Sequence, residues 1–434
     1  SSPVAWSSFW TGSWSKDHLI FDFLLRNPRN YMVQPSVVDT QWKPRFFPPY
    51  SFKNLRVGNP FYEYLDACKV GFSVLSAPFI FPSDTALKYG NVHMGIGVPD
   101  ILGTNSTFAV ITDDTSLLKK TLSGGIAIKA DNSEGENEFN SFIPGPKQLS
   151  VDNDSSRQGG HQIHIQLFQK EKQAKIKSED ISLTLSLNKP SEKVIITFLN
   201  QDKKPIKGQT YFIFKKMKPL ILYVAPVGID PQQPLWNITI PPNFIKDLHK
   251  ENAEMRTIGW PSDTSALGEG IISSEDFMNE ALNEMEIQEK MTIRAIQDKK
   301  KAFISTFFTA TDRVSHMFLK DGPFYDGTGN MTSAKKGVSK KKKNTSNDTA
   351  ISETPIVTIY KKMDTVIGNI LKNLTDETMI IMSDHGFHSF TKGFSINTWL
   401  LKKGYIKLND DNPKYGDNDI LLKDVIWEKT QAYS

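Results

Sequence analysis

Two short apolar runs separated by an amphipathic helix constrain the fold of this chain more than any other feature of its sequence. The first run extends from Ala302 to Phe308 and the second from Met379 to Met382. Between them, Thr354-Pro355 begins a segment whose apolar residues recur every three or four positions, as on one buried helix face. These residues are Ile356, Ile359, Tyr360, Met363, Ile367, Ile370, Leu371 and Leu374. A strand, a helix and a strand in this order predict a parallel sheet in an α/β domain.

The middle of the chain follows a different pattern, in which apolar and polar residues alternate. Ile163, Ile165 and Leu167 alternate with polar residues, and the run Ile181 to Leu187 does the same. Half-buried strands have this period of two residues. Turns rich in Gly, Asn, Asp and Pro separate three more predicted strands, at Val194–Phe198, Tyr211–Phe214 and Leu220–Val224.

A chain of 434 residues is too long for one ordinary core. We therefore predict three parts. Residues 1–73 form the first part of an α/β catalytic core, residues 74–240 form a β-rich insertion or cap, and residues 241–434 form the second part of the core. A helix is predicted from Ser274 to about Asp298, and residues 322–353 are predicted to be a low-complexity surface loop, rich in Ser, Thr, Asn, Gly and Lys.

Composition excludes several classes of protein. The net charge of +4, from 52 basic and 48 acidic residues, gives no case for nucleic-acid binding. Cys68, the one cysteine, cannot form an intrachain disulfide, so the cysteine count does not assign a compartment. No run of about 18 apolar residues predicts a membrane span. Because the chain begins at Ser1 without an initiator methionine, we expect it to be a piece of a longer protein.

Carboxylate and imidazole side chains follow both apolar runs that we predict to be strands. Asp312 and His316 come four residues apart after the first run, and Asp384 and His385 directly follow the second. Ligand sites of parallel sheets form beyond the carboxyl ends of the strands. Two Asp and two His side chains make a mixed nitrogen and oxygen ligand set that suits Zn²⁺, with Mn²⁺ or Fe as alternatives. Either pair alone is a common surface feature, but the two together favour a metal site.

A serine is predicted at the start of the first helix. Ser2-Pro3 precedes Trp6, Phe9 and Trp10, and Thr11-Gly12 is a suitable helix end. The free backbone N–H groups and the dipole at a helix N-terminus favour an anion. A hydroxyl there is placed to attack phosphorus when a metal ion lowers its pKa. The structural alternative is that the serine only caps the helix.

The segment Ser2–Gly12, followed by His18 and Ile20–Phe23, resembles the nucleophile segment of alkaline phosphatase superfamily phosphodiesterases. The resemblance is closest to the type I phosphodiesterase/nucleotide pyrophosphatase-like branch and its phosphohydrolase/phosphomutase-like members. It covers nearly the whole chain and also rests on Gly97–Asp100, Asp230-Pro231 and Asn397–Leu400. It implies an alkaline phosphatase-like core with a mostly parallel sheet flanked by helices, plus a β-rich insertion.

The same resemblance implies roles for individual residues. Ser2 matches the nucleophile, which forms a phosphoserine intermediate. Asp312 and His316 match the ligands of one metal ion, and Asp384 and His385 match those of a second; zinc is the expected metal and manganese the alternative. A family aspartate that precedes the nucleophile and a late histidine have no match in this chain. Arg26 and Arg313 are candidate contacts for the substrate anion, because guanidinium matches phosphate geometry. Ordinary ion pairs are the alternative for both arginines.

The function implied is metal-dependent hydrolysis of a small phosphorylated substrate, as in phosphodiesterases and nucleotide pyrophosphatases. A phosphomutase of the same superfamily remains an alternative, because it uses a hydroxyl nucleophile and similar metals. A catalytically inactive binding protein is the alternative from another class. A sulfatase is disfavoured because the run from Ser1 to Ala5 lacks the arginine of the sulfatase motif.

Overall fold

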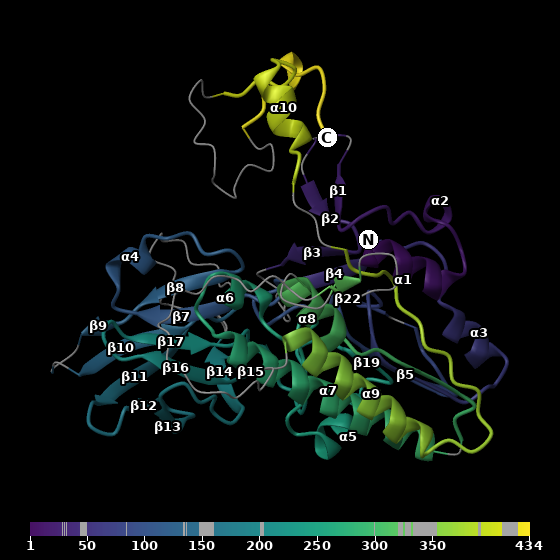
Figure 1. Ribbon diagram of the computed structural model, residues 1–434, viewed down its shortest axis with the longest axis horizontal. Coiled ribbons are helices and arrows are strands. Elements are labelled where there is room, and N and C mark those ends of the chain that lie inside the picture. Colours follow the sequence, from purple (N-terminus) through teal and green to yellow (C-terminus); the bar gives the residue numbers. More distant parts are fainter. Residues whose placement is uncertain are drawn as a thin grey trace.

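The computed structural model has a mixed α/β fold, with several sheets and with helices distributed along the chain (Figure 1). It describes residues 1–434 except 28, 30, 32, 44–49, 84, 133–134, 136, 147–159, 200–203, 299, 320–323, 326–330, 333–353, 389–391 and 410–423. Among the described residues, no helix combines the length and apolar character needed to cross a membrane.

One four-stranded sheet contains the strand predicted at residues 302–308. Its order is β19 (Thr239–Ile240), β6 (Gly90–Met94), β5 (Phe72–Ala77) and β20 (Phe303–Thr306). β6, β5 and β20 are parallel, and β19 is antiparallel to β6. All six residues of β5 are buried, as expected for a strand covered on both faces. The prediction of a parallel strand at 302–308 is therefore confirmed.

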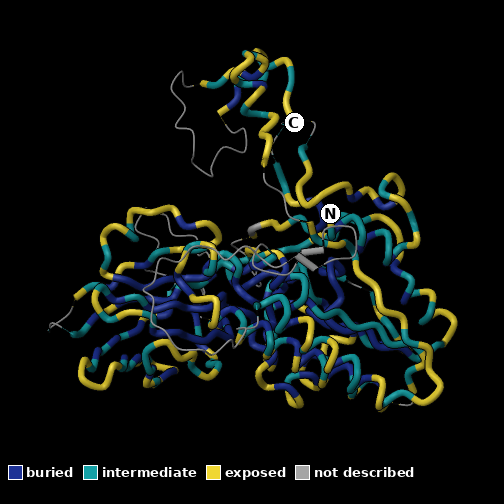
Figure 2. Tube along the Cα trace, viewed as in Figure 1, coloured by how far each residue is buried: buried dark blue, intermediate teal, exposed yellow. Residues whose placement is uncertain are grey.

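The β-rich half consists of three further sheets. One has the order β16 (Phe212–Lys216), β17 (Ile221–Val224), β7 (Phe108–Thr112) and β8 (Gly125–Lys129). The second runs β13 (Ser182–Ser186), β12 (Gln173–Lys177), β11 (His161–Phe168), β10 (Glu138–Ile143) and β9 (Asp131–Asn132), and the third runs β14 (Val194–Leu199), β15 (Pro205–Thr210) and β18 (Gly228–Ile229). The predicted strands of the middle region are all present. Figure 2 shows their buried residues as a continuous interior.

Three helices pack together (Figure 1), and the first of them also contacts β20 and β5. They are α7 (Ser274–Gln297), α8 (Ala310–Phe318) and α9 (Pro355–Leu371). α7 begins with a capping box in which Ser273 and Asp276 satisfy each other's backbone N–H groups. Phe277, Val314 and Ile359 belong to the apolar core that the three helices share. The helices predicted from Ser274 and from Thr354-Pro355 are thus confirmed.

The remaining elements are short and lie toward the ends of the chain and in its connections. The helices are α1 (Ser2–Thr11), α2 (Ser15–His18), α3 (Phe61–Ala67), α4 (Thr115–Leu118), α5 (Phe244–Glu251), α6 (Thr264–Gly268), α10 (Ile396–Lys402) and a 3-10 turn at Trp427–Lys429. Three strand pairs join β1 (Leu24–Arg26) to β2 (Val33–Pro35), β3 (Val38–Trp42) to β4 (Tyr50–Asn54), and β21 (Phe324–Tyr325) to β22 (Met331–Thr332).

The strand predicted at Met379–Met382 is wrong. These residues belong to no strand, and Ile380, Ile381 and Met382 are 82%, 65% and 53% exposed. A strand requires a hydrogen-bonded neighbour as well as a β-like composition, and no described strand pairs with this segment. Met379 alone of the four packs partly against the helical core. Only β20 therefore follows the predicted pattern of a strand leading to a ligand cluster.

The three-part division of the chain stays a prediction. β5 crosses the expected boundary at residue 73, and it shares a sheet with β6, β19 and β20. The β-rich sheets draw their strands from residues 108–229. Most of the predicted loop at 322–353 lies outside the described residues, apart from the strand pair β21–β22.

Burial of His93 in β6 predicts a measurable loss of stability in acid. The imidazole is 7% exposed, its Nδ1 accepts the Ser76 N–H at 3.3 Å, and burial lowers the pKa of His93 to about 4. The unfolded chain therefore takes up a proton below about pH 6.5 that the folded chain refuses until about pH 4. As the pH falls through that window, His93 lowers the free energy of unfolding by roughly 1.4 kcal/mol per pH unit.

We expect His93→Asn to remove this dependence. Between pH 7 and pH 5, urea unfolding should show the variant losing about 2 kcal/mol less stability than the original chain. An identical pH profile for both proteins would show that folding does not lower the pKa of His93.

Candidate metal and nucleophile site

The helix that follows β20 presents two of the predicted ligands on one face. Asp312 lies in the first turn of α8 and His316 lies four residues later, so both side chains project from the same side. Asp312 Oδ1 is 3.4 Å from His316 Nε2. The carboxylate is 31% exposed and the imidazole 53% exposed, so this face of α8 is open to solvent.

His385 joins that pair from a distant part of the chain. Its Nε2 atom lies 3.7 Å from Asp312 Oδ1 and 3.6 Å from Asp384 Oδ2. One ligand atom from each of Asp312, His316 and His385 falls within 4.8 Å of the other two. The structure therefore brings Asp312, His316 and His385 into one cluster, and Asp384 lies beside it through its contact with His385.

The hydrogen bonding of His385 sets which of its nitrogens carries a lone pair. Nδ1 lies 3.1 Å from the Gly386 carbonyl oxygen, which can only accept, so Nδ1 is the donor. In the neutral ring Nε2 is then unprotonated and faces the cluster. A backbone carbonyl that fixes the ring in this way is a common partner of a metal-binding histidine.

Ser2 completes the cluster from the N-terminus of α1. Its Oγ lies 3.1 Å from His385 Nε2, and the hydroxyl donates to that nitrogen because Nδ1 is the protonated one. Ser1 occupies the N-cap position and makes no side-chain cap bond. Of the two adjacent hydroxyls, the structure places Ser2 against the histidine.

Aromatic packing explains why α1 reaches the end of β20. The Trp6 and Trp10 rings lie 4.7 Å and 5.4 Å from the ring of Phe307, which directly follows β20. Trp10 is fully buried and donates its indole N–H to the Pro78 carbonyl at 2.8 Å. These contacts hold the first turn of α1 next to the junction between β20 and α8.

Phe387 is a member of the site that the sequence pattern did not single out. Its ring lies 4.8 Å from the His316 ring and 5.1 Å from the His385 ring, both in edge-on geometry. It therefore packs against both imidazoles and limits their rotation. The sequence feature that could have indicated its place in the site is its position two residues after His385.

The donor set fits a divalent metal ion of the zinc type. Two imidazole nitrogens and carboxylate oxygens are ordinary zinc ligands, and three protein ligands leave room for a water or a substrate. Manganese accepts the same donors less tightly.

The two arginines proposed as anion contacts lie in other surroundings. Arg26 donates from Nη1 to the Tyr31 carbonyl at 2.7 Å and lies 5.8 Å and 5.0 Å from the rings of Trp427 and Tyr433. Arg313 is buried and donates from Nη2 to the Ser262 carbonyl at 3.0 Å. Their contact with a substrate stays a prediction.

An α/β fold with nitrogen and oxygen donors at the end of a parallel strand is typical of metal-dependent enzymes. The family model described as type I phosphodiesterase / nucleotide pyrophosphatase matches residues 168–429, more than half of the chain. The chain therefore belongs to this family, which is part of the alkaline phosphatase superfamily. The matched region contains Asp312, His316, Asp384 and His385 and does not reach Ser2. No curated protein and no solved structure matches the chain.

Proposed function

We propose that this chain is a phosphoester hydrolase of the phosphodiesterase/pyrophosphatase type. In this proposal Ser2 is the nucleophile, and the cluster of Asp312, His316, Asp384 and His385 holds divalent metal ions. The observation that carries the proposal is the 3.1 Å contact between Ser2 Oγ and His385 Nε2. It places the Ser2 hydroxyl against His385, which is 383 positions away in the sequence and belongs to a cluster of side chains that can bind a metal ion. Family membership supports hydrolysis of phosphoesters and a need for metal.

The expected ligands are Asp312 and His316 for one ion and Asp384 and His385 for the other, and zinc is favoured over manganese. Divalent ions held there would supply positive charge, which favours an ionised hydroxyl and stabilises charge on phosphoryl oxygens. We also propose that the sheet containing β5, β6 and β20 belongs to an alkaline phosphatase-like core.

The chain's own residues then perform two displacements. Ser2 Oγ gives up its proton and attacks the phosphorus atom, and the bond from phosphorus to the leaving oxygen breaks. The leaving group takes up a proton and departs as the alcohol, and Ser2 becomes phosphorylated; with a diester substrate the phosphoserine keeps the second ester group. The N-terminus of α1 favours the anionic group at this position. Water then attacks the phosphoserine, which releases the phosphate product and restores the Ser2 hydroxyl. Phe387 keeps the two imidazoles oriented throughout.

An assay with two model esters tests this proposal. The protein, loaded with zinc or manganese, is given bis-p-nitrophenyl phosphate and, separately, p-nitrophenyl phosphate. We expect hydrolysis that a chelator abolishes and added metal restores, with the diester as the better substrate. A folded protein that binds no metal would contradict the proposal. Transfer of the phosphoryl group to a second hydroxyl, without net hydrolysis, would favour the phosphomutase alternative instead.

A further inference from the structure

Arg313 follows Asp312 in the sequence but lies in the interior. Its side chain is 8% exposed, and its guanidinium lies 4.9 Å from the Trp260 ring. Nη2 donates to the Ser262 carbonyl oxygen at 3.0 Å and to Thr264 Oγ1 at 3.3 Å. One guanidinium therefore joins α8 to three positions of the turn at residues 260–264.

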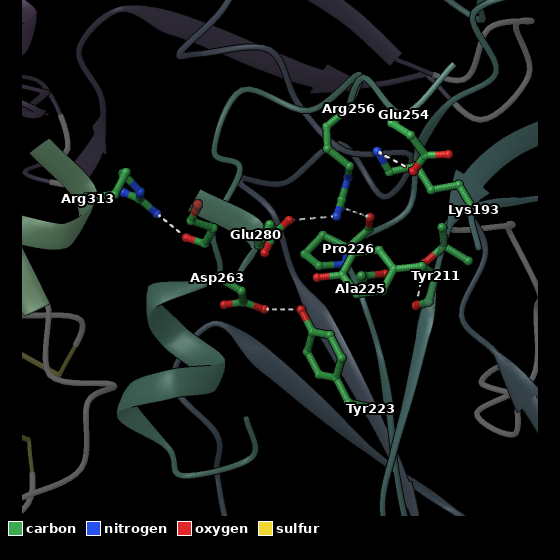
Figure 3. A network of polar contacts seen from close by, with 12 residues as sticks. Lys193, Tyr211, Tyr223, Ala225, Pro226, Glu254, Arg256, Asp263, Glu280 and Arg313 are labelled. Atoms are coloured by element: carbon green, nitrogen blue, oxygen red, sulfur yellow. Dashed lines mark hydrogen bonds and ion pairs between the residues drawn. The ribbon is translucent and has the colours of Figure 1, made fainter. Parts of the chain in front are cut away.

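That turn is itself fixed to the β-rich half. Asp263 caps α6 by accepting the Ala266 N–H at 2.8 Å, and its other oxygen accepts the Tyr223 hydroxyl at 2.9 Å (Figure 3). Tyr223 belongs to β17 and is fully buried, and Asp263 is 6% exposed. A continuous chain of buried contacts thus runs from β17 through Asp263 and the turn to Arg313 on α8.

α8 packs against α7 and α9 through apolar side chains such as Ala310 and Val314, and Arg313 adds directional polar contacts near the end where Asp312 lies. The helix has nine residues, and its N-cap residue, Thr309, makes no side-chain cap bond. Helices this short are marginal by themselves and take their stability and direction from tertiary contacts. A planar guanidinium with several donors restrains orientation better than a single flexible charge.

We propose that Arg313 is a positioning residue that orients α8, and through it Asp312 and His316, for metal binding. The inference rests on the metal site of the proposed function. It differs from the expectation that Arg313 touches the substrate, because it assigns the guanidinium to the 260–264 turn. The β-rich half then contributes to the metal site through Tyr223 and Asp263, although it supplies no ligand itself.

Arg256 offers a matched control for Arg313. It is 7% exposed, lies 5.1 Å from the Tyr211 ring, and donates to the Pro226 carbonyl at 2.8 Å (Figure 3). It also pairs with Glu280 at 2.9 Å. Replacing either arginine by lysine keeps the charge and removes a buried guanidinium that stacks on an aromatic ring. Only the change at Arg313 loosens α8 directly.

The experiment measures zinc affinity in the absence of substrate, together with the melting temperature, for Arg313→Lys and Arg256→Lys. We expect Arg313→Lys to raise the zinc Kd about 10-fold or more, in the range seen when residues that orient ligands are changed. Arg256→Lys should lower the melting temperature and leave the zinc Kd within about twofold, because its contacts do not reach α8. Tyr223→Phe, which releases the turn from β17, should also raise the zinc Kd.

Each outcome separates this inference from the proposed function. If the original chain binds no zinc, the proposed metal site itself fails. If the original chain binds zinc and Arg313→Lys leaves the zinc Kd unchanged, Arg313 has no positioning role. The same conclusion follows if both arginine variants raise the zinc Kd by the same factor. A raised KM with an unchanged zinc Kd would overturn the inference and assign Arg313 to the substrate. If Arg313→Lys does not fold, Tyr223→Phe decides: a raised Kd supports the inference and an unchanged Kd overturns it.

Discussion

Replacing Ser2 by alanine should lower kcat for phosphoester hydrolysis by at least about 10³-fold, because the variant lacks the atom that attacks phosphorus. Among the described residues, the hydroxyl makes one side-chain hydrogen bond, the 3.1 Å contact with His385 Nε2, and this bond is lost with it. Since Ser2 is a helical residue rather than the N-cap, alanine suits its position and the helix should persist. Steady-state kinetics with the better of the two nitrophenyl esters measures the effect.

Ser1→Ala is the matched control for this experiment. Ser1 carries the same hydroxyl one residue earlier, is exposed and makes no side-chain cap bond, so its loss should leave kcat within about twofold. A trapped phosphoryl group should be found on Ser2 by mass spectrometry of acid-quenched enzyme. Unchanged activity in Ser2→Ala, or equal loss in both variants, would remove Ser2 from the mechanism.

Replacing Asp312 by alanine should remove the central ligand of the cluster. Its carboxylate lies between two imidazoles, 3.4 Å from His316 Nε2 and 3.7 Å from His385 Nε2. Without it, the remaining neutral nitrogens bind a divalent ion with less charge compensation and one donor fewer. Changing a residue that only orients a metal ligand lowers metal affinity by up to ~100-fold. Because Asp312 would be a ligand itself, we expect zinc affinity to fall by more than this, and hydrolysis to fall with it.

Metal titration by calorimetry and metal analysis after dialysis check this prediction. Asp364→Ala provides the control, because Asp364 is an exposed aspartate on α9 and its loss removes the same charge elsewhere. Asp312→Ala should still fold, since the carboxylate is 31% exposed. Zinc binding that survives in Asp312→Ala at the original affinity would place the metal elsewhere in the protein.

Local sequence pattern was sufficient to predict most elements around the site. The apolar run at 302–308 contains β20, the period of three to four residues after Pro355 gives α9, and Ser2-Pro3 begins α1. Each prediction relies on neighbours within a few residues, which is the range over which helix caps and strand alternation act. The ligand types at the ends of these elements were readable for the same reason.

The run at 379–382 shows where local pattern fails. Its composition favours a strand, but a strand forms only when a neighbour offers free backbone groups at the right distance. Whether such a neighbour exists depends on the arrangement of the whole chain, and three of the four side chains are exposed here. His385, which follows this run, nevertheless reaches the cluster.

The sequence by itself determined the chemistry available to this protein: a serine at a helix start, and two Asp and two His residues of the type that bind zinc. Only the tertiary structure decided which of these groups meet. Ser2 and His385 are 383 positions apart and touch because Trp6 and Trp10 pack α1 against Phe307. Arg313 turns inward to Trp260 while its neighbour Asp312 faces the cluster. Side-chain chemistry belongs to a residue, whereas proximity depends on packing between segments that the sequence separates.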